Sequence, residues 1–455
     1  MKILLIFPSS ETPFKLESEY PLGVLYLASI LEKEGHQVLV RDYYESAFDE
    51  TKDKMINLIK NYSPDIVGLS CVTMNRISCF KIAKIVKKIN PHIKVIMGGV
   101  HTVTLYEQIL KNFPVDAIVI GEGEETTPEL INAFEKNKTL KRIKGIAFKE
   151  KGEVFFTGRR DFKKDLNEIP FPKHELLEYK IKKSKVASII TSRGCPFNCI
   201  FCSTSSYWGV RWRPRSAENV TEEIEYLTKR FPYLKKIIIQ DDTFVVDNQR
   251  VIDICNRILE RGIKINWECS GRIDRITEEM LIKMKEAGCK KIYYGVESGS
   301  KKMLETIEKK ITREQIKKTI DITNKVGLAY GAYLMVGNPG ETWETVKESN
   351  EFLQKLDNLK INSIGKLEIY PNTKIYEIAK KQGIIEDSYW ITEKKVPHYT
   401  FEHSVEELTE MAYYLVAKNQ LKQGVINFFM FGFKFFLAKP RKAIRYLLLK
   451  IGLIS

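Results

Sequence analysis

Over residues 1–140, short apolar runs alternate with stretches in which apolar positions recur with helical periodicity. The apolar runs have strand length and predict strands at Lys2–Phe7, Gln37–Arg41, Ile66–Ser70, Lys94–Met97 and Ala117–Ile120. The amphipathic stretches predict helices between them at Gly23–Glu34, Glu50–Asn61 and Ile77–Ile89. Strand–helix alternation with short links is typical of an open parallel α/β sheet that is covered by helices on both faces.

A second strand–helix series follows a connector at residues 141–185. Its expected strands are Ala187–Thr191, Lys236–Gln240, Asn266–Ser270, Lys291–Tyr294 and Ala332–Val336. Its expected helices are Ala217–Arg230, Arg250–Glu260, Glu278–Ala287, Lys301–Glu308 and Arg313–Val326. This spacing fits a partial TIM-type β/α barrel, whose chemistry belongs at the carboxyl ends of the strands. We therefore predict an α/β protein with a Rossmann-like domain (1–140), the connector, a barrel with its post-barrel region (186–400) and a helical tail (401–455).

Composition narrows the classes of protein. The 455 residues carry a formal charge of +15, but eight Lys and Arg and no Asp or Glu lie in residues 411–455. Because the positive charge is concentrated in that tail, we do not expect a nucleic-acid partner. No signal peptide and no apolar run of membrane-spanning length are visible, so we expect a cytoplasmic protein.

Five of the eight cysteines, Cys71, Cys79, Cys255, Cys269 and Cys289, are scattered, and we interpret them as small buried apolar residues. The other three lie on one short loop after the strand expected at Ala187–Thr191. Cys195, Cys199 and Cys202 have the spacing CxxxCxxC. Three thiolates on such a loop hold three irons of a [4Fe–4S] cluster and leave the fourth iron open to a non-protein ligand. Zinc would need a fourth protein ligand, which no nearby Cys or His provides.

CxxxCxxC with an aromatic residue before its last cysteine resembles the signature of radical S-adenosylmethionine (SAM) enzymes. In that family SAM binds the open iron, and an electron from the cluster cleaves it to a 5′-deoxyadenosyl radical that abstracts a substrate hydrogen. The resemblance implies that the three cysteines ligate the cluster and that Phe201 lies near the adenine. It also implies an external electron donor of the flavodoxin or ferredoxin type.

The resemblance implies further SAM contacts at the ends of successive barrel strands. These are Gln240, Asp241, Asp242, Ser270, Arg272, Glu297, Gly337 and Gly340. At the second strand the family usually has a Gly-Gly-Glu-like turn, from which Gln240-Asp241-Asp242 departs. The two aspartates would equally serve to cap the helix that follows.

The first 130 residues resemble the cobalamin-binding domain that precedes the barrel in one large radical SAM subfamily. The resemblance rests on the ordered motifs Pro21-Leu22-Gly23, Gly35-His36, Gly98-Gly99-Val100-His101 and Gly121-Glu122-Gly123-Glu124. It implies cobalamin contacts at Ser9, Gly23, Ser70, Thr73, Gly98, Gly99, His101, Gly121, Glu122 and Gly123. The Asp-x-His-x-x-Gly motif, whose histidine ligates cobalt, is absent. The domain therefore binds cobalamin without a histidine below the cobalt, or it keeps the fold without the cofactor.

The tail combines Phe-rich and basic sequence. Val425–Leu437 contains six Phe and is followed by Lys439-Pro440-Arg441-Lys442. This pattern favours a helix that lies on the inner face of an anionic membrane, with a helix packed on the barrel as the alternative. Membrane contact would make a lipid-like or otherwise hydrophobic substrate plausible.

Three functions remain open. In the first, cobalamin carries a methyl group from one SAM while a second SAM generates the radical, and an unactivated carbon becomes methylated. In the second, cobalamin assists a radical cyclisation, oxidation or rearrangement, as in the family's anaerobic porphyrin ring cyclase. The third is a SAM- and cobalamin-binding sensor without turnover, which an accessible reducible cluster disfavours.

Overall fold

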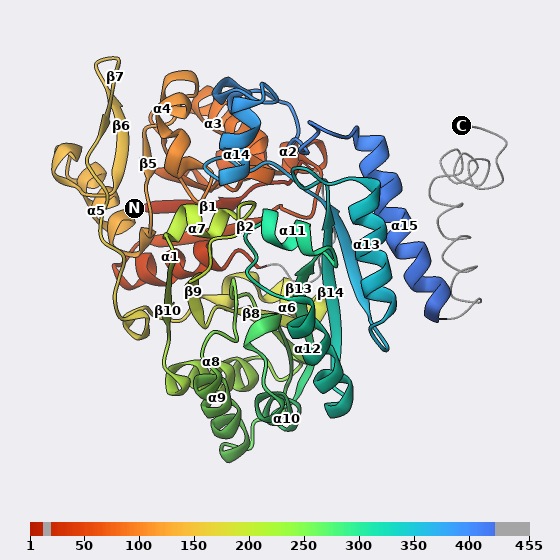
Figure 1. Ribbon diagram of the computed structural model, residues 1–455. Coiled ribbons are helices and arrows are strands. Elements are labelled where there is room, and N and C mark those ends of the chain that lie inside the picture. Colours follow the sequence, from red (N-terminus) through yellow and green to blue (C-terminus); the bar gives the residue numbers. More distant parts are fainter. Residues whose placement is uncertain (12–19, 424–455) are drawn as a thin grey trace. The chain divides into compact units, whose positions relative to one another are not determined.

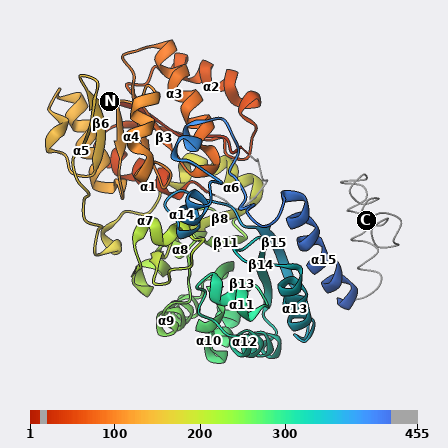
Figure 2. The same ribbon diagram turned by 45° about the horizontal axis from the view of Figure 1, so that its top comes forward.

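The computed structural model describes residues 1–11 and 20–423 (Figures 1 and 2). The chain divides into two compact units. The first unit comprises Met1–Ser270, Lys283–Lys290 and Glu368–Pro397. The second comprises Gly271–Ile282, Lys291–Leu367 and, among the described residues, His398–Gln423.

A seven-stranded sheet forms the N-terminal part of the first unit, with the strand order β2-β1-β3-β4-β5-β6-β7. The strands are β1 (Lys2–Phe7), β2 (Gln37–Asp42), β3 (Ile66–Ser70), β4 (Lys94–Gly98), β5 (Ala117–Val119), β6 (Ile146–Glu150) and β7 (Glu153–Phe156). Strands β1 to β5 pair in parallel, as predicted. Strands β6 and β7 lie in the segment that was expected to be a connector, but they extend this sheet. Strand β6 pairs antiparallel with β5, and β7 pairs antiparallel with β6.

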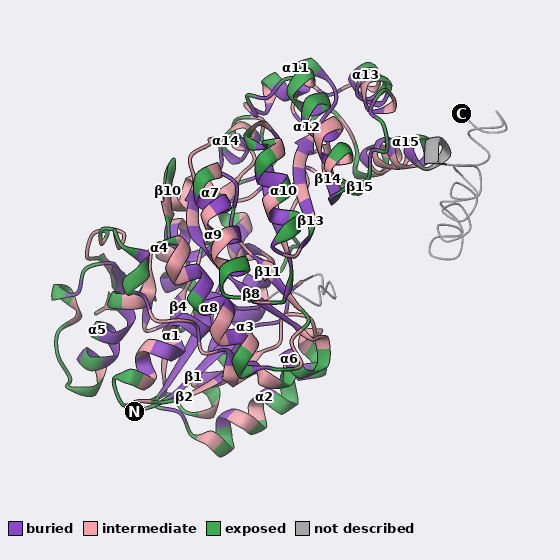
Figure 3. Ribbon diagram, turned by 90° about the horizontal axis from the view of Figure 1, so that it is seen from below, coloured by how far each residue is buried: buried purple, intermediate pink, exposed green. Residues whose placement is uncertain are grey.

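Helices cover this sheet on both faces. They are α1 (Leu22–Lys33), α2 (Phe48–Tyr62), α3 (Arg76–Ile89), α4 (Thr102–Asn112) and α5 (Gly123–Glu135). Helix α1 packs against α5, and α2 packs against α3. The central strands are consequently buried, as the purple strands in Figure 3 show. In a sheet of order 2-1-3-4-5 ligands bind beyond the carboxyl ends of the strands, near the point where the order reverses.

The first unit also contains the start of the second strand–helix series. Strands β8 (Val186–Ile189), β11 (Lys236–Ile239) and β12 (Asn266–Arg272) pair in parallel in this order. Strands β9 (Ser192–Cys195) and β10 (Arg211–Pro214) form a separate antiparallel pair. The helices of this part are α6 (Glu178–Ser184), α7 (Ser203–Trp208), α8 (Ala217–Arg230), α9 (Asn248–Glu260) and α14 (Lys374–Lys381).

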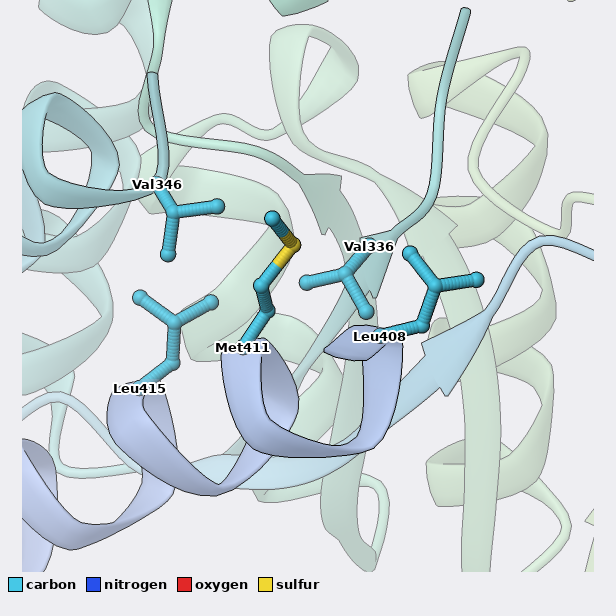
Figure 4. Packing of buried hydrophobic residues seen from close by; sticks show 5 residues of the cluster. All are labelled: Val336, Val346, Leu408, Met411 and Leu415. Carbon is cyan, nitrogen blue, oxygen red and sulfur yellow. The ribbon is translucent and has the colours of Figure 1, made fainter. Parts of the chain in front are cut away.

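The second unit continues the series with parallel strands β13 (Cys289–Glu297), β14 (Ala329–Val336) and β15 (Ile361–Lys366). Its helices are α11 (Lys301–Thr306), α12 (Arg313–Val326), α13 (Trp343–Gln354) and α15 (Val405–Gln423), together with the part of α10 (Glu278–Glu286) up to Ile282. Helix α15 is anchored by an apolar cluster, shown in Figure 4, of Val336, Val346, Leu408, Met411 and Leu415. The alternation of parallel strands and helices is that of a partial β/α barrel with a helical C-terminal region.

Within residues 1–11 and 20–423, no helix is both long enough and apolar enough to cross a membrane. The segment Val425–Leu437, for which a membrane-surface helix was predicted, lies outside the described residues.

Candidate functional site

The three-cysteine loop begins in β9 and ends at α7. Gly194 lies in β9 with a φ of +83°, a conformation that glycine adopts without strain. A Cβ at Gly194 would lie 2.4 Å from the carbonyl oxygen of Arg211, so this position requires glycine. Cys199 is buried, whereas Cys195 and Cys202 are half-buried. The Cys202 N–H donates to the Cys199 carbonyl at 3.1 Å, which closes the turn around the last two cysteines.

The thiol groups of this loop carry no disulfide. Burial raises the pKa of Cys195 to about 11, and the charges of Cys202, Asp242 and Cys199 add to the shift. Among the described residues, no three His, Cys, Asp or Glu side chains converge as they would around a single metal ion. In a [4Fe–4S] cluster each cysteine binds a different iron, so three thiols on one loop without a fourth fit a cluster better than zinc.

Asp241, a predicted SAM contact, is bound to the residues just before the cysteines. Its carboxylate accepts hydrogen bonds from the backbone N–H and the hydroxyl of Thr191 and from the hydroxyl of Ser192, all at 2.6 Å. The Asp241 side chain is buried, with 6% of the residue exposed. Arg250 donates to the carbonyl of Thr191 at 2.6 Å from the other side. Asp241 therefore anchors the start of the loop.

Asp242 is bound to both ends of the loop. It accepts from the Gly194 N–H at 3.2 Å and from the Thr204 hydroxyl at 2.8 Å. The neighbouring Gln240 donates from Nε2 to the Ser188 hydroxyl at 3.1 Å. Asp242 is exposed, so it still faces solvent beside the cysteines. Phe201, the predicted neighbour of the adenine, is half-buried.

Ser270 is half-buried at the end of the first unit, where its carbonyl accepts from the Phe244 N–H at 3.1 Å. In the second unit, Arg272 pairs with Asp274 at 2.7 Å and donates to the carbonyl of Lys309.

The other predicted SAM contacts of the second unit also lie at strand ends. Glu297 has a φ of +66°, which is uncommon for a residue with a side chain, and pairs with the Lys309 ammonium at 2.8 Å. The Gly337 N–H donates to Glu341 at 2.6 Å, and the Gly340 N–H donates to Glu402 at 3.0 Å. The SAM roles of all these residues remain predictions.

A cavity of about 350 Å³ opens within the first unit. A volume of this order is typical of small-molecule sites. From the N-terminal sheet and its helices, the residues that line the cavity include Gly23, Ser70, Gly98, Gly99, Gly121, Glu122 and Gly123. From the second strand–helix series it is lined by Ile190, Ser192, Arg193, Tyr207, Trp208, Gln240 and Asp242.

Glycines give the cavity its shape. A Cβ at Gly99, where φ is +115°, would lie 2.5 Å from the Cys71 carbonyl oxygen, so the turn after β4 needs glycine. A Cβ at Gly68 would lie 2.6 Å from the Leu5 side chain, and Leu5 also lines the cavity. Gly23 has no atom within 4 Å of a Cβ placed there, so its absent side chain leaves open space. Close approach of backbone to a large cofactor fits this arrangement.

Three predicted cobalamin contacts do not line this cavity. The Ser9 hydroxyl lies 3.3 Å from that of Thr51. His101 is fully buried, with Nδ1 3.2 Å from the Thr73 hydroxyl. Burial, aided by the positive charge of Arg76, lowers the pKa of His101 to about 3, so the imidazole is neutral. These side chains pair inside the protein, and their cofactor roles remain predictions.

Two arginines in the cavity region were given no role from the sequence. Arg193 pairs with Glu122 and with Glu124, at 2.6 Å each, and Arg213 pairs with Glu122 at 2.9 Å. The Tyr207 hydroxyl donates to the Gly121 carbonyl at 2.8 Å. These contacts join the turn after β5 to the pair β9–β10. No local sequence pattern links residues that are about 70 and 90 positions apart.

Two domain families match the sequence. Residues 17–131 match the B12 binding domain, and residues 189–353 match the radical SAM superfamily. These matches confirm the predicted cofactors, namely a [4Fe–4S] cluster with SAM, and cobalamin.

Relatives and solved structures agree with this division. The chain is 37% identical to an uncharacterized methyltransferase of Pyrococcus horikoshii, over 91% of this chain and 92% of that protein. It is 30% identical to the anaerobic magnesium-protoporphyrin IX monomethyl ester cyclase of Rubrivivax gelatinosus, over 72% of this chain but only 61% of the cyclase. Its fold is similar to that of the cobalamin-dependent SAM radical enzyme OxsB with aqua-cobalamin bound. The TM-score is 0.73 at 21% identity, over 99% of this chain and 75% of OxsB. The chain therefore belongs to the radical SAM enzymes that carry a B12-binding domain before the radical SAM domain.

Proposed function

We propose that this enzyme transfers a methyl group from SAM, by way of cobalamin, to an unactivated carbon atom. The observation that supports this most is the composition of the cavity wall. Gly23, Gly99 and Gly121 line it from the B12-binding domain, and Arg193 and Asp242 line it from the region of the cysteine loop. A methyl donor and a radical source that share one cavity can act on the same substrate carbon.

The chain's own residues would hold and orient the cofactors. Cys195, Cys199 and Cys202 would bind three irons of the cluster, and the glycine turns of the cavity would accept cobalamin. When bound, these groups supply hydrogen-atom abstraction and a transferable methyl group. Asp241 and Asp242 would fix the cysteine loop through their hydrogen bonds, and Asp242 also lines the cavity.

Methyl transfer is supported by the Pyrococcus horikoshii relative, which is named a methyltransferase and matches over nearly its whole length. A second candidate is a radical cyclisation, oxidation or rearrangement without methyl transfer. The 30% identity to a porphyrin ring cyclase favours this alternative, although the chain covers only 61% of that protein. In either case the enzyme would need an external electron donor of the flavodoxin or ferredoxin type.

The test is anaerobic reconstitution with iron, sulfide and hydroxocobalamin, followed by reduction in the presence of SAM. 5′-Deoxyadenosine reports reductive SAM cleavage, and S-adenosylhomocysteine reports methyl transfer from SAM. We expect both from the wild type. We expect Cys199→Ala to lose the cluster absorbance and 5′-deoxyadenosine. Cys255→Ala, which removes a buried thiol outside the loop, should keep both and serves as the matched control.

The products separate the candidates. 5′-Deoxyadenosine without S-adenosylhomocysteine, in protein with cobalamin bound, would favour cyclisation or rearrangement. Absence of both products, with cluster absorbance unaffected by Cys199→Ala, would overturn the assignment of the cysteine loop.

A further inference from the structure

Two arginines stand directly opposite each other on the strand pair that carries the first cysteine. In the antiparallel register of β9 and β10, Arg193 is opposite Arg213, and Cys195 is opposite Arg211. Like charges at directly opposite positions destabilise a strand pair unless a counter-charge lies between them. The counter-charge here comes from a distant part of the sequence, the Gly121–Glu124 turn after β5.

Glu122 neutralises both arginines. One carboxylate oxygen accepts from Arg193 at 2.6 Å and from Arg213 at 2.9 Å. The other accepts from Arg213 at 3.1 Å and from the Lys163 N–H at 2.9 Å. Burial alone would raise the pKa of Glu122, but hydrogen bonds and charges of Arg213 and Arg193 hold it below its usual value. The carboxylate is thus fully engaged within the protein, which leaves it no acceptor position for a cofactor.

Glu124 completes the arrangement. It binds the second terminal nitrogen of Arg193 at 2.6 Å, so this guanidinium bridges two carboxylates from one turn. The Tyr26 ring lies 5.3 Å from the same guanidinium. Side chains of Arg193, Glu122 and Glu124 are only 9–11% exposed, so solvent screens these ion pairs weakly.

We propose that Glu122, Glu124, Arg193 and Arg213 form a clamp that positions the cysteine loop against the cobalamin cavity and so couples the two cofactor sites. Glu122 and Glu124 belong to the cavity wall, and Arg193 is two residues before Cys195. Glu122 is therefore a positioning residue and not a cobalamin ligand. The inference depends on the proposed function only in that both cofactors must bind.

A clamp of this kind has a thermodynamic consequence. If it transmits the ordering of one site to the other, the cluster must tighten cobalamin binding by the same factor as cobalamin tightens cluster binding. Couplings between sites are typically in the range of about 5- to 150-fold. If a contact only stabilises the fold, its removal weakens cobalamin binding equally with and without the cluster. The ratio of the two Kd values for cobalamin then stays constant.

The experiment measures the Kd of hydroxocobalamin by anaerobic equilibrium dialysis, with cluster-loaded and with chelator-stripped protein. For the wild type we expect cobalamin to bind about tenfold more tightly when the cluster is present. Arg193→Lys keeps the charge but cannot bridge two carboxylates. It should bring the ratio of the cobalamin Kd without the cluster to that with the cluster below about twofold. Arg160→Lys is the matched control. Like Arg193, Arg160 bridges two glutamates, here Glu125 and Glu129, but it does not line the cavity.

Outcomes for the clamp and for the proposed function are separable. Wild-type protein that binds neither cofactor would refute the proposed function. Wild-type protein that binds both, with the same ratio in Arg193→Lys or with no coupling at all, would overturn the clamp alone. If Arg193→Lys does not fold, Glu124→Gln supplies the same comparison, since it removes one charge and keeps the Glu122–Arg193 pair. An unchanged ratio in that variant would likewise overturn the clamp.

Discussion

Replacing Asp241 by asparagine separates two roles for this residue, SAM contact and anchor of the cysteine loop. The carboxylate accepts three hydrogen bonds at 2.6 Å, from the N–H and hydroxyl of Thr191 and from the hydroxyl of Ser192. In Asp241→Asn, Oδ1 still accepts from the Thr191 N–H. The oxygen that accepted from both hydroxyls becomes an NH2 donor, and both of those bonds are lost.

The cost follows from the number and type of these bonds. A hydrogen bond to a charged group contributes about 1.5–3 kcal/mol, so losing two would cost roughly 3–6 kcal/mol. The hydroxyls can rotate to accept from the new amide, so we expect about 2–4 kcal/mol of lost stability. For a unit of about 300 residues that corresponds to a fall in Tm of roughly 3–6 °C.

The assay is thermal unfolding of the cluster-free protein without SAM, followed by iron retention after reconstitution. Asp253→Asn is the control, because Asp253 accepts only from the Gln249 amide at 2.9 Å in the described structure. Its effect should stay within about 0.5 kcal/mol. The anchor interpretation is refuted if Asp241→Asn unfolds at the same temperature as the control and weakens only SAM binding.

Two more predictions concern the B12-binding domain. Gly23→Leu fills open cavity space without backbone strain and should abolish cobalamin binding. Lys33→Leu, at an exposed position on the same helix, is the control and should leave binding unchanged. Bound cobalamin is measured by absorbance after gel filtration, and its retention by Gly23→Leu would show that the cofactor lies elsewhere. His101, whose pKa falls from its usual 6.5 to about 3 in the folded state, binds fewer protons there than in the unfolded chain, so stability falls as the pH drops below 6.5. Between pH 6.5 and 5 this loss of stability amounts to roughly 2 kcal/mol. The free energy of unfolding in urea should fall by this amount in the wild type but not in His101→Gln. An equal loss in the wild type and in His101→Gln would place the acid sensitivity at another residue.

Local patterns were sufficient for much of the fold and for the cysteine loop. The strand Lys2–Phe7 and the helix Ala217–Arg230 were predicted to the residue, because short apolar runs and amphipathic periodicity are local signals. The requirement for glycine at Gly99 and Gly194 arises from turns only a few residues long. The loop signature is likewise contained in eight consecutive residues.

The partners of the charged residues could not be read in the same way. Glu122 belongs to a glycine-rich turn that suggests a ligand, but its carboxylate is taken up by Arg193 and Arg213. His101 follows the cavity turn by two residues, but it points into the interior towards Thr73. Strands β6 and β7 pair with a sheet that precedes them in sequence. Each of these features depends on contacts between elements that are distant in the sequence. A local residue pattern does not predict such contacts.

The central claim is that the cobalamin cavity and the cysteine loop share a wall, so that both cofactors face one space. Electron paramagnetic resonance of the protein loaded with cob(II)alamin and the cluster tests this directly. Reducing the cluster should broaden or split the Co(II) signal, because two paramagnetic centres on one cavity interact magnetically. A Co(II) signal that is identical before and after cluster reduction, in a sample shown to contain both cofactors, would contradict the claim.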